Sequence, residues 1–252
     1  MRVNRRRILG TLASAAVLSS GLGRAAAQST PVAATGMVPG YAIARVRVQP
    51  TPELAAAVVG DVLANFLPPT TALPGYAGYV FSAHVTDPTA SLSLTLLADE
   101  AAAAAAGEVA REYVASLDPR FATETPVAEQ GPVRIYQTTT RTAAELPPFL
   151  NGCLFTMRNW RNAPDTDIEA VIARNSNGLT PLIAAMPGFV LYLWLQTAEG
   201  RTAINIWETA DHLAAGNEAV ATWVAANSVE TIAAAPVVNE GIVVYADIPG
   251  FI

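Results

Sequence analysis

The chain has no lysine, one cysteine and two histidines among its 252 residues. Cys153 therefore has no partner for an internal disulfide. With His84 and His212 alone it cannot complete a metal site without several carboxylates, so we expect no metal. Cys153 lies in an apolar run, which favours an inert buried thiol over a nucleophile. All fifteen basic residues are arginine, and the formal net charge is −6. An acidic chain without lysine argues against nucleic acid and anionic membranes as partners.

The sequence also lacks the common motifs of catalysis. It contains no phosphate-binding loop, no dinucleotide fingerprint and no zinc-ligand spacing. His84 lies near Asp87 and Ser91, but no Gly-x-Ser-x-Gly elbow accompanies them, so a hydrolytic triad is disfavoured.

Residues 1–27 have the features of an export signal. The sequence at 4–9, NRRRIL, is similar to a twin-arginine motif, and an apolar stretch follows at 8–22. Ala25–Ala27 predicts cleavage before Gln28, the alternative being an uncleaved anchor. Cleavage removes five arginines and no acid, which changes the formal net charge from −6 to −11. We expect export across the cytoplasmic membrane to a periplasmic or extracellular location, without stable membrane insertion after cleavage.

Two stretches about 110 residues apart carry the same pattern. Each opens with a Pro-Gly turn, at 73–76 and 186–189, continues with two apolar runs and ends in an Ala-rich segment. Only four positions are identical between 94–114 and 204–224, so the order of turn, hairpin and helix is the stronger signal. A repeat of this length is typical of a small domain copied in tandem.

Hydrophobic periodicity predicts strand, helix, strand, strand, helix, strand in each half. Thr51 and Pro52 predict a helix start that Pro68-Pro69 ends, and Asp165 or Thr166 predicts another. The expected strands are 41–48, 76–85, 91–97, 133–140, 153–160, 189–197, 202–208 and 241–248. The expected helices are 53–66, 100–117, 166–175, a short 180–186, and 210–226. The expected segments are a signal peptide (1–27), a flexible tether (28–39), a first repeat (40–140), a linker (141–151) and a second repeat (152–252).

A β-α-β-β-α-β unit has the ferredoxin-like fold, with both helices on one face of an antiparallel sheet. Strand 189–197 is apolar on both faces, so its second face also needs a cover. Met186–Phe189, followed by Ile204–Glu208 leading into a helix, resembles the antibiotic-biosynthesis-monooxygenase-like domains of the dimeric α+β barrel superfamily. The resemblance implies an α+β fold in which two ferredoxin-like repeats form within one chain the barrel that relatives build from two. A monomeric pseudo-dimer is the expected state.

The same resemblance implies a ligand pocket between the sheet of one unit and its helices. In the second repeat the expected lining residues are Asn159, Tyr192, Trp194, Asn205, Trp207 and Glu208, with Trp223. All four tryptophans follow residue 150, and they either wall a cavity for a flat organic molecule or fill a core. Strand register decides which of these side chains point inward. Glu208 is read as a helix-start acid in preference to a general base.

Some members of the family degrade haem with an Asn, a Trp and a His. Asn159 and Trp207 match the first two, but the His position falls near Gly216, which cannot ligate iron. His212 lies about one turn too early. In the first repeat Leu97 stands at the position of Trp207. We therefore expect no cofactor, with haem disfavoured.

Three functional hypotheses follow. The favoured one is an exported protein that binds a small apolar or aromatic molecule without catalysis, because the helix around Ala101–Ala106 offers no side chain for chemistry. The second is a cofactor-independent or haem-linked monooxygenase, an oxidoreductase with its site in the second repeat. The third is a module that docks on an envelope partner, which a large exposed apolar patch would indicate.

Overall fold

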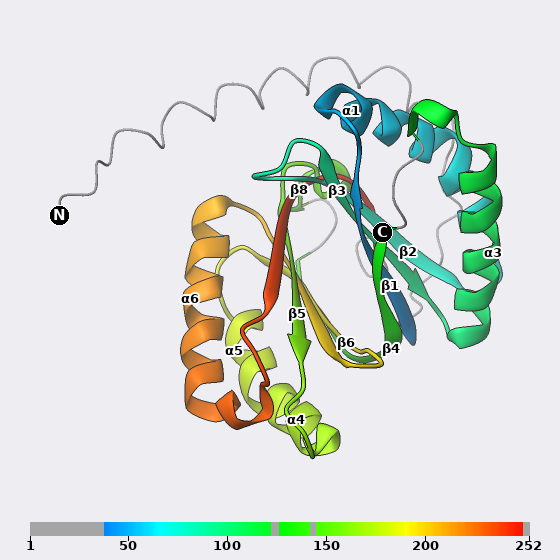
Figure 1. The fold of residues 1–252 in the computed structure, drawn as a ribbon. Coiled ribbons are helices and arrows are strands. Elements are labelled where there is room, and N and C mark those ends of the chain that lie inside the picture. Colours follow the sequence, from blue (N-terminus) through cyan, green and yellow to red (C-terminus); the bar gives the residue numbers. More distant parts are fainter. Residues whose placement is uncertain (1–37, 122–125, 142–144, 249–252) are drawn as a thin grey trace. The chain divides into compact units, whose positions relative to one another are not determined.

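The computed structural model describes residues 38–121, 126–141 and 145–248 (Figure 1). The strands are β1 (Tyr41–Val48), β2 (Tyr76–His84), β3 (Ala90–Leu97), β4 (Val127–Thr138), β5 (Leu154–Arg161), β6 (Phe189–Gln196), β7 (Gly200–Trp207) and β8 (Val237–Asp247). The α-helices are α1 (Pro52–Asp61), α2 (Leu67–Thr71), α3 (Glu100–Ser116), α4 (Ile168–Arg174), α5 (Thr180–Ala184) and α6 (Ala210–Asn227). Two π-helical turns, η3 (Val62–Phe66) and η7 (Asn175–Leu179), join α1 to α2 and α4 to α5.

The eight strands form one closed antiparallel barrel in the order β1-β3-β2-β8-β5-β7-β6-β4. Within each half the order is that of a ferredoxin-like sheet. Closure comes from β2 pairing with β8 and β4 pairing with β6, so the second strand of each repeat lies beside the fourth strand of the other. The predicted α+β fold with two ferredoxin-like repeats in an intrachain barrel is confirmed.

The duplication holds at the level of single residues. Tyr41 in β1 lies opposite Leu97 in β3, as Leu154 in β5 lies opposite Trp207 in β7. The bulge after Tyr76 in β2 recurs 113 residues later, after Phe189 in β6. Both π turns obey the same 113-residue offset, whereas the strands and helices after each hairpin differ by 110. A π turn kept in both copies is a feature of the shared fold and not a local accident.

Apolar side chains fill the barrel interior from both repeats, including Leu94 and Ile204. The outer face of each sheet carries its own core under its helices. In the first repeat this core includes Phe66, Tyr79 and Tyr113, and in the second it includes Tyr192. The helices of the two repeats lie on opposite sides of the strands (Figure 1). Every strand is thus covered on both faces, which explains a hydrophobic fraction of 52%.

The proline pair does not end the first helix as predicted. The chain stays helical from Pro52 to Thr71, because the π turn at Val62–Phe66 widens the helix just before Pro68. The hydroxyl of Thr70 donates to the carbonyl of Phe66 at 2.7 Å and replaces a missing backbone donor. By length and mean hydropathy (1.2) this helix could cross a membrane. Here it packs on the outer face of the first sheet through side chains such as Val58.

Other boundaries also differ from the predicted ones. Asp167, not Asp165 or Thr166, caps α4, accepting from the Ala170 amide at 3.1 Å. Strand β4 begins at Val127 and β8 at Val237, earlier than predicted. The first half of β4 pairs with β1 and its second half with β6, so one strand serves two neighbours and has to be long.

Candidate functional site

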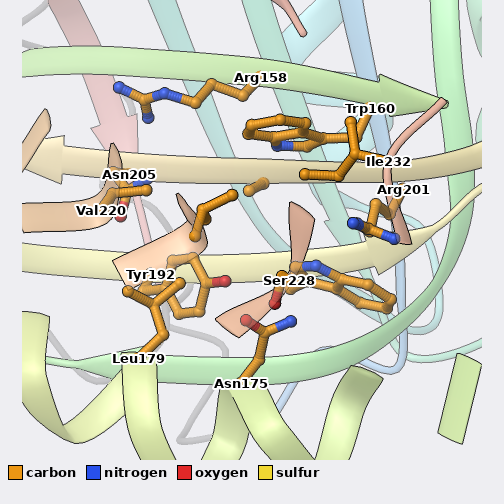
Figure 2. Close-up of a pocket in the computed structure, with 13 residues that line it drawn as sticks. Arg158, Trp160, Asn175, Leu179, Tyr192, Arg201, Asn205, Val220, Ser228 and Ile232 are labelled. Atoms are coloured by element: carbon orange, nitrogen blue, oxygen red, sulfur yellow. The ribbon is translucent and has the colours of Figure 1, made fainter. Parts of the chain in front are cut away.

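A small cavity lies in the second repeat between the outer face of its sheet and the helices that cover it (Figure 2). Its volume is about 30 Å³, which is room for roughly two water molecules. The lining residues are Arg158, Trp160, Asn175, Leu179, Tyr192, Trp194, Arg201, Ala203, Asn205, Val220, Val224, Ser228 and Ile232. The side chains of Trp160, Val224 and Ile232 are half-buried, so they mark the side that faces solvent.

Aromatic side chains supply most of the cavity wall. Tyr192 and Trp194 project from β6 toward the helices and are each 2% exposed. They alternate with Leu191, Leu193 and Leu195, which point into the barrel. Burial raises the pKa of the Tyr192 hydroxyl well above its ordinary value, so Tyr192 stays neutral and offers an O–H donor.

Two buried arginines lie at opposite ends of the cavity, with Tyr192 between them (Figure 2). Arg158 on β5 is 7% exposed and donates through one terminal nitrogen to Oδ1 of Asn217. Asn217 in turn donates to Glu240 at 3.3 Å. Burial lowers the pKa of Arg158, with Glu240 and Tyr192 opposing, yet a guanidinium remains charged at any physiological pH.

Arg201 on β7 is 5% exposed and more firmly held. It donates to Oδ1 of Asn162 at 2.6 Å, to Oγ1 of Thr231 at 2.9 Å and to the Thr231 carbonyl at 3.4 Å. Burial also lowers its pKa, and the nearby Tyr192 and Glu230 oppose the shift. The aliphatic part of each arginine packs in the wall, and a positive charge stands at each end.

Three uncharged polar residues complete the lining. Asn175 comes from the first position of the π turn η7, which turns its side chain toward the sheet. Oδ1 of Asn205 and Oγ of Ser228 are buried and have no hydrogen-bond partner among the described residues. Unpaired buried acceptors and donors are uncommon because each costs free energy, and here two of them line one cavity.

The structure brings three of the predicted site residues together and separates the other three. Tyr192, Trp194 and Asn205 line the cavity. Trp207 does not, because its ring packs edge-to-face on Phe189, with 5.7 Å between ring centroids. On its other side the Trp207 ring abuts Gly216, where an added Cβ would lie 2.3 Å from Cζ2.

Asn159 and Glu208 also lie away from the cavity. Asn159 accepts a hydrogen bond from Thr202 at 3.1 Å, next to two residues of β5 and β7 that do line it. Glu208 forms an ion pair with Arg141, which also donates to the Phe189 carbonyl at 3.1 Å. Glu208 therefore anchors the segment after β4 to the second repeat.

Arg158 and Arg201 were not among the predicted site residues, although the repeat contained a signal for one of them. With the 113-residue offset, Arg45 in β1 is the counterpart of Arg158, and Tyr79 is the counterpart of Tyr192. An arginine kept at the same place in two otherwise dissimilar apolar strands is unusual. In the first repeat Arg45 faces Thr95, 3.5 Å away, and the rings of Phe66 and Tyr113 pack 5.3 Å apart beside it.

Comparison with solved structures supports the fold. A "putative monooxygenase" of Fusobacterium nucleatum superposes with a TM-score of 0.64 at 13% identity, covering 85% of this chain and 96% of that one. An "anthrone oxidase-like protein" gives 0.57 at 16% identity, covering 84% and 94%. A "putative chlorite dismutase" gives 0.54 at 10% identity, covering 82% and 96%. No family model matches the sequence, and no curated protein matches it. At these identities the likeness shows the shared barrel fold.

Haem does not fit the cavity as its residues are arranged. Pockets for ligands of drug size or larger span several hundred Å³, against about 30 Å³ here. Neither His84 nor His212 lines it, and the ring of His212 lies against Gly188 at the far side of Trp207. The position where relatives would place a ligating His is taken by Gly216, under the Trp207 ring.

Proposed function

We propose that this protein binds a small aromatic molecule at the cavity of its second repeat. The observation that carries the proposal is a cavity walled by Trp160, Tyr192 and Trp194, with two unpaired buried polar atoms inside it. Buried polar atoms of this kind gain free energy when a ligand supplies their partners. The small volume admits a polar head group, and the ring of the ligand then lies against the half-buried Trp160 and Ile232 at the solvent side.

Intrinsic fluorescence of the full chain tests this proposal, because Trp160 and Trp194 line the cavity. Titration with benzamide should quench the emission saturably. Ala203→Leu fills the cavity and should abolish that saturation, since Ala203 is a small lining residue. The matched control is Ser93→Leu, at the equivalent place in β3 of the first repeat, and it should leave the titration unchanged. An equal loss in both variants, or no saturation in the parent protein, would count against the site.

Oxidation of the bound molecule is the second candidate function. The support is the fold shared with proteins named as a monooxygenase and an anthrone oxidase-like protein. In such a reaction without a cofactor, a ring CH₂ group becomes a carbonyl, O₂ accepts the four electrons, and its second oxygen atom leaves as water. Oxygen uptake by the purified protein with anthrone, against the Ala203→Leu variant, tests this candidate. Uptake that equals the spontaneous rate would leave binding alone.

We also propose that residues 1–27 direct export and that the mature chain is a monomer. The support for export is the NRRRIL sequence at 4–9 and the Ala25–Ala27 cleavage signal, both outside the described residues. The support for a monomer is that one chain closes the barrel by itself. N-terminal sequencing of the secreted protein should start at Gln28, and sedimentation should give the mass of one chain.

A further inference from the structure

The cavity of the second repeat carries positive charge without a compensating acid. Arg158 and Arg201 both line it, and no aspartate or glutamate does. Among the described residues, the ion pairs within 4.0 Å involve six other arginines and neither of these two. Glu240 approaches Arg158 only through Asn217, and Glu230 is bound by Arg174. Buried cations without a contacting anion cost free energy, and a bound anion would offset that cost.

The second repeat has gained polar groups that the first lacks. At equivalent positions Ser91 corresponds to Arg201, and Val62 to Asn175. The arginine on the first strand of each repeat belongs to the shared design. Arg201 and Asn175 occur in the second copy alone, where the cavity is.

We infer that the ligand carries a compact organic anion, most simply a carboxylate, bound by Arg158 and favoured by the charge of Arg201. This inference rests on the proposed binding function. A guanidinium has five N–H donors, and Arg158 uses one of them within the described residues. Arg201 uses more of its donors to hold Asn162 and Thr231, so its role is electrostatic. The cavity, with room for about two water molecules, matches the two oxygens of a carboxylate.

The substrate class is therefore a small aromatic acid. The ring would lie against Trp160, beside Arg158 (Figure 2). An overall acidic chain disfavours anions at its surface, so selective uptake of an acid has to come from these buried arginines.

Calorimetric titration with benzoate and benzamide, two probes of the same shape and different charge, tests this inference. We expect the full chain to bind benzoate at least roughly tenfold more tightly, because charge-assisted hydrogen bonds are about twice as strong as neutral ones. Arg158→Gln should remove that preference while leaving benzamide affinity within about twofold. Arg45→Gln, the matched change in the first repeat, should leave both affinities unchanged.

The outcomes separate this inference from the proposed function. Equal affinities of the parent protein for the two probes would overturn anion recognition while leaving ligand binding in place. Binding of neither probe would overturn both. A benzoate preference that survives Arg158→Gln would remove Arg158 as the anchor. The comparison of the two probes on the parent protein needs no variant, so a folding defect in Arg158→Gln cannot obscure the result.

Discussion

Replacing Gly216 by alanine should change protein stability with a sign that depends on residue 207. An added Cβ at Gly216 would lie 2.3, 2.7 and 2.9 Å from three atoms of the Trp207 ring. That ring is 1% exposed and braced by Phe189, so it has little room to move. Overpacking a core costs up to about 3 kcal/mol, while replacing glycine by alanine inside a helix gains about 1 kcal/mol. The net expectation is a loss of about 2 kcal/mol.

The first repeat shows how the conflict is resolved. With the 110-residue offset, Leu97 is the counterpart of Trp207 and Ala106 of Gly216. Trp207→Leu alone should cost about 3 kcal/mol, because it leaves a cavity above Gly216. In that background Gly216→Ala meets no ring and should stabilise by about 1 kcal/mol through helix propensity.

Urea unfolding of the four proteins in this double-mutant cycle measures the coupling, which we expect to be about 3 kcal/mol. Gly107→Ala is the control, since no atom lies within 4 Å of a Cβ added there in α3. It should stabilise by roughly 0.5–1 kcal/mol. If Gly216→Ala destabilises both backgrounds equally, the packing argument and the paired equivalence between the repeats are refuted.

Three other expectations follow from buried groups and backbone geometry. Burial raises the pKa of the Cys153 thiol to about 11, so a disulfide reagent at pH 8 should label the native protein far more slowly than the urea-unfolded one. Burial also raises the pKa of Asp247, a shift that the hydrogen bond from Tyr76 opposes. The stabilisation from protonated Asp247 is complete at low pH and lost as pH rises through the raised pKa. Asp247→Asn should therefore flatten that decline in urea titrations. Gly188→Ala should cost more than 1 kcal/mol, because φ is +71° there, whereas Gly60→Ala, in an open helical position, should be neutral or stabilising.

Most of the fold could be predicted from the sequence because its signals are local. Alternating apolar residues defined β1 at its true bounds, and Thr51 and Asp99 each cap a helix as expected. The π turns could not be predicted, because Pro68-Pro69 after an apolar helix is ordinarily a stop signal. Only the widened turn before Pro68 lets the helix continue.

The site was harder to predict, because it depends on register and on distant contacts. Tyr192 and Trp194 line the cavity by the alternation of β6, which the sequence shows. Trp207 has the same chemistry and still packs in a core, since Gly216 from another element accommodates its ring. Arg201 stands in a polar stretch at the start of β7, where an exposed side chain is the ordinary expectation. Its burial arises from Asn162 and Thr231, which lie far along the chain.

Closure of the barrel by β2 with β8 and β4 with β6 has an evolutionary consequence. In a barrel of two identical subunits, every substitution is made twice, so both halves must tolerate it. Covalent fusion releases the halves from that constraint while geometry still keeps them together. One half can then be selected for solidity, as Leu97 with Ala106 illustrates, and the other for discrimination among guests.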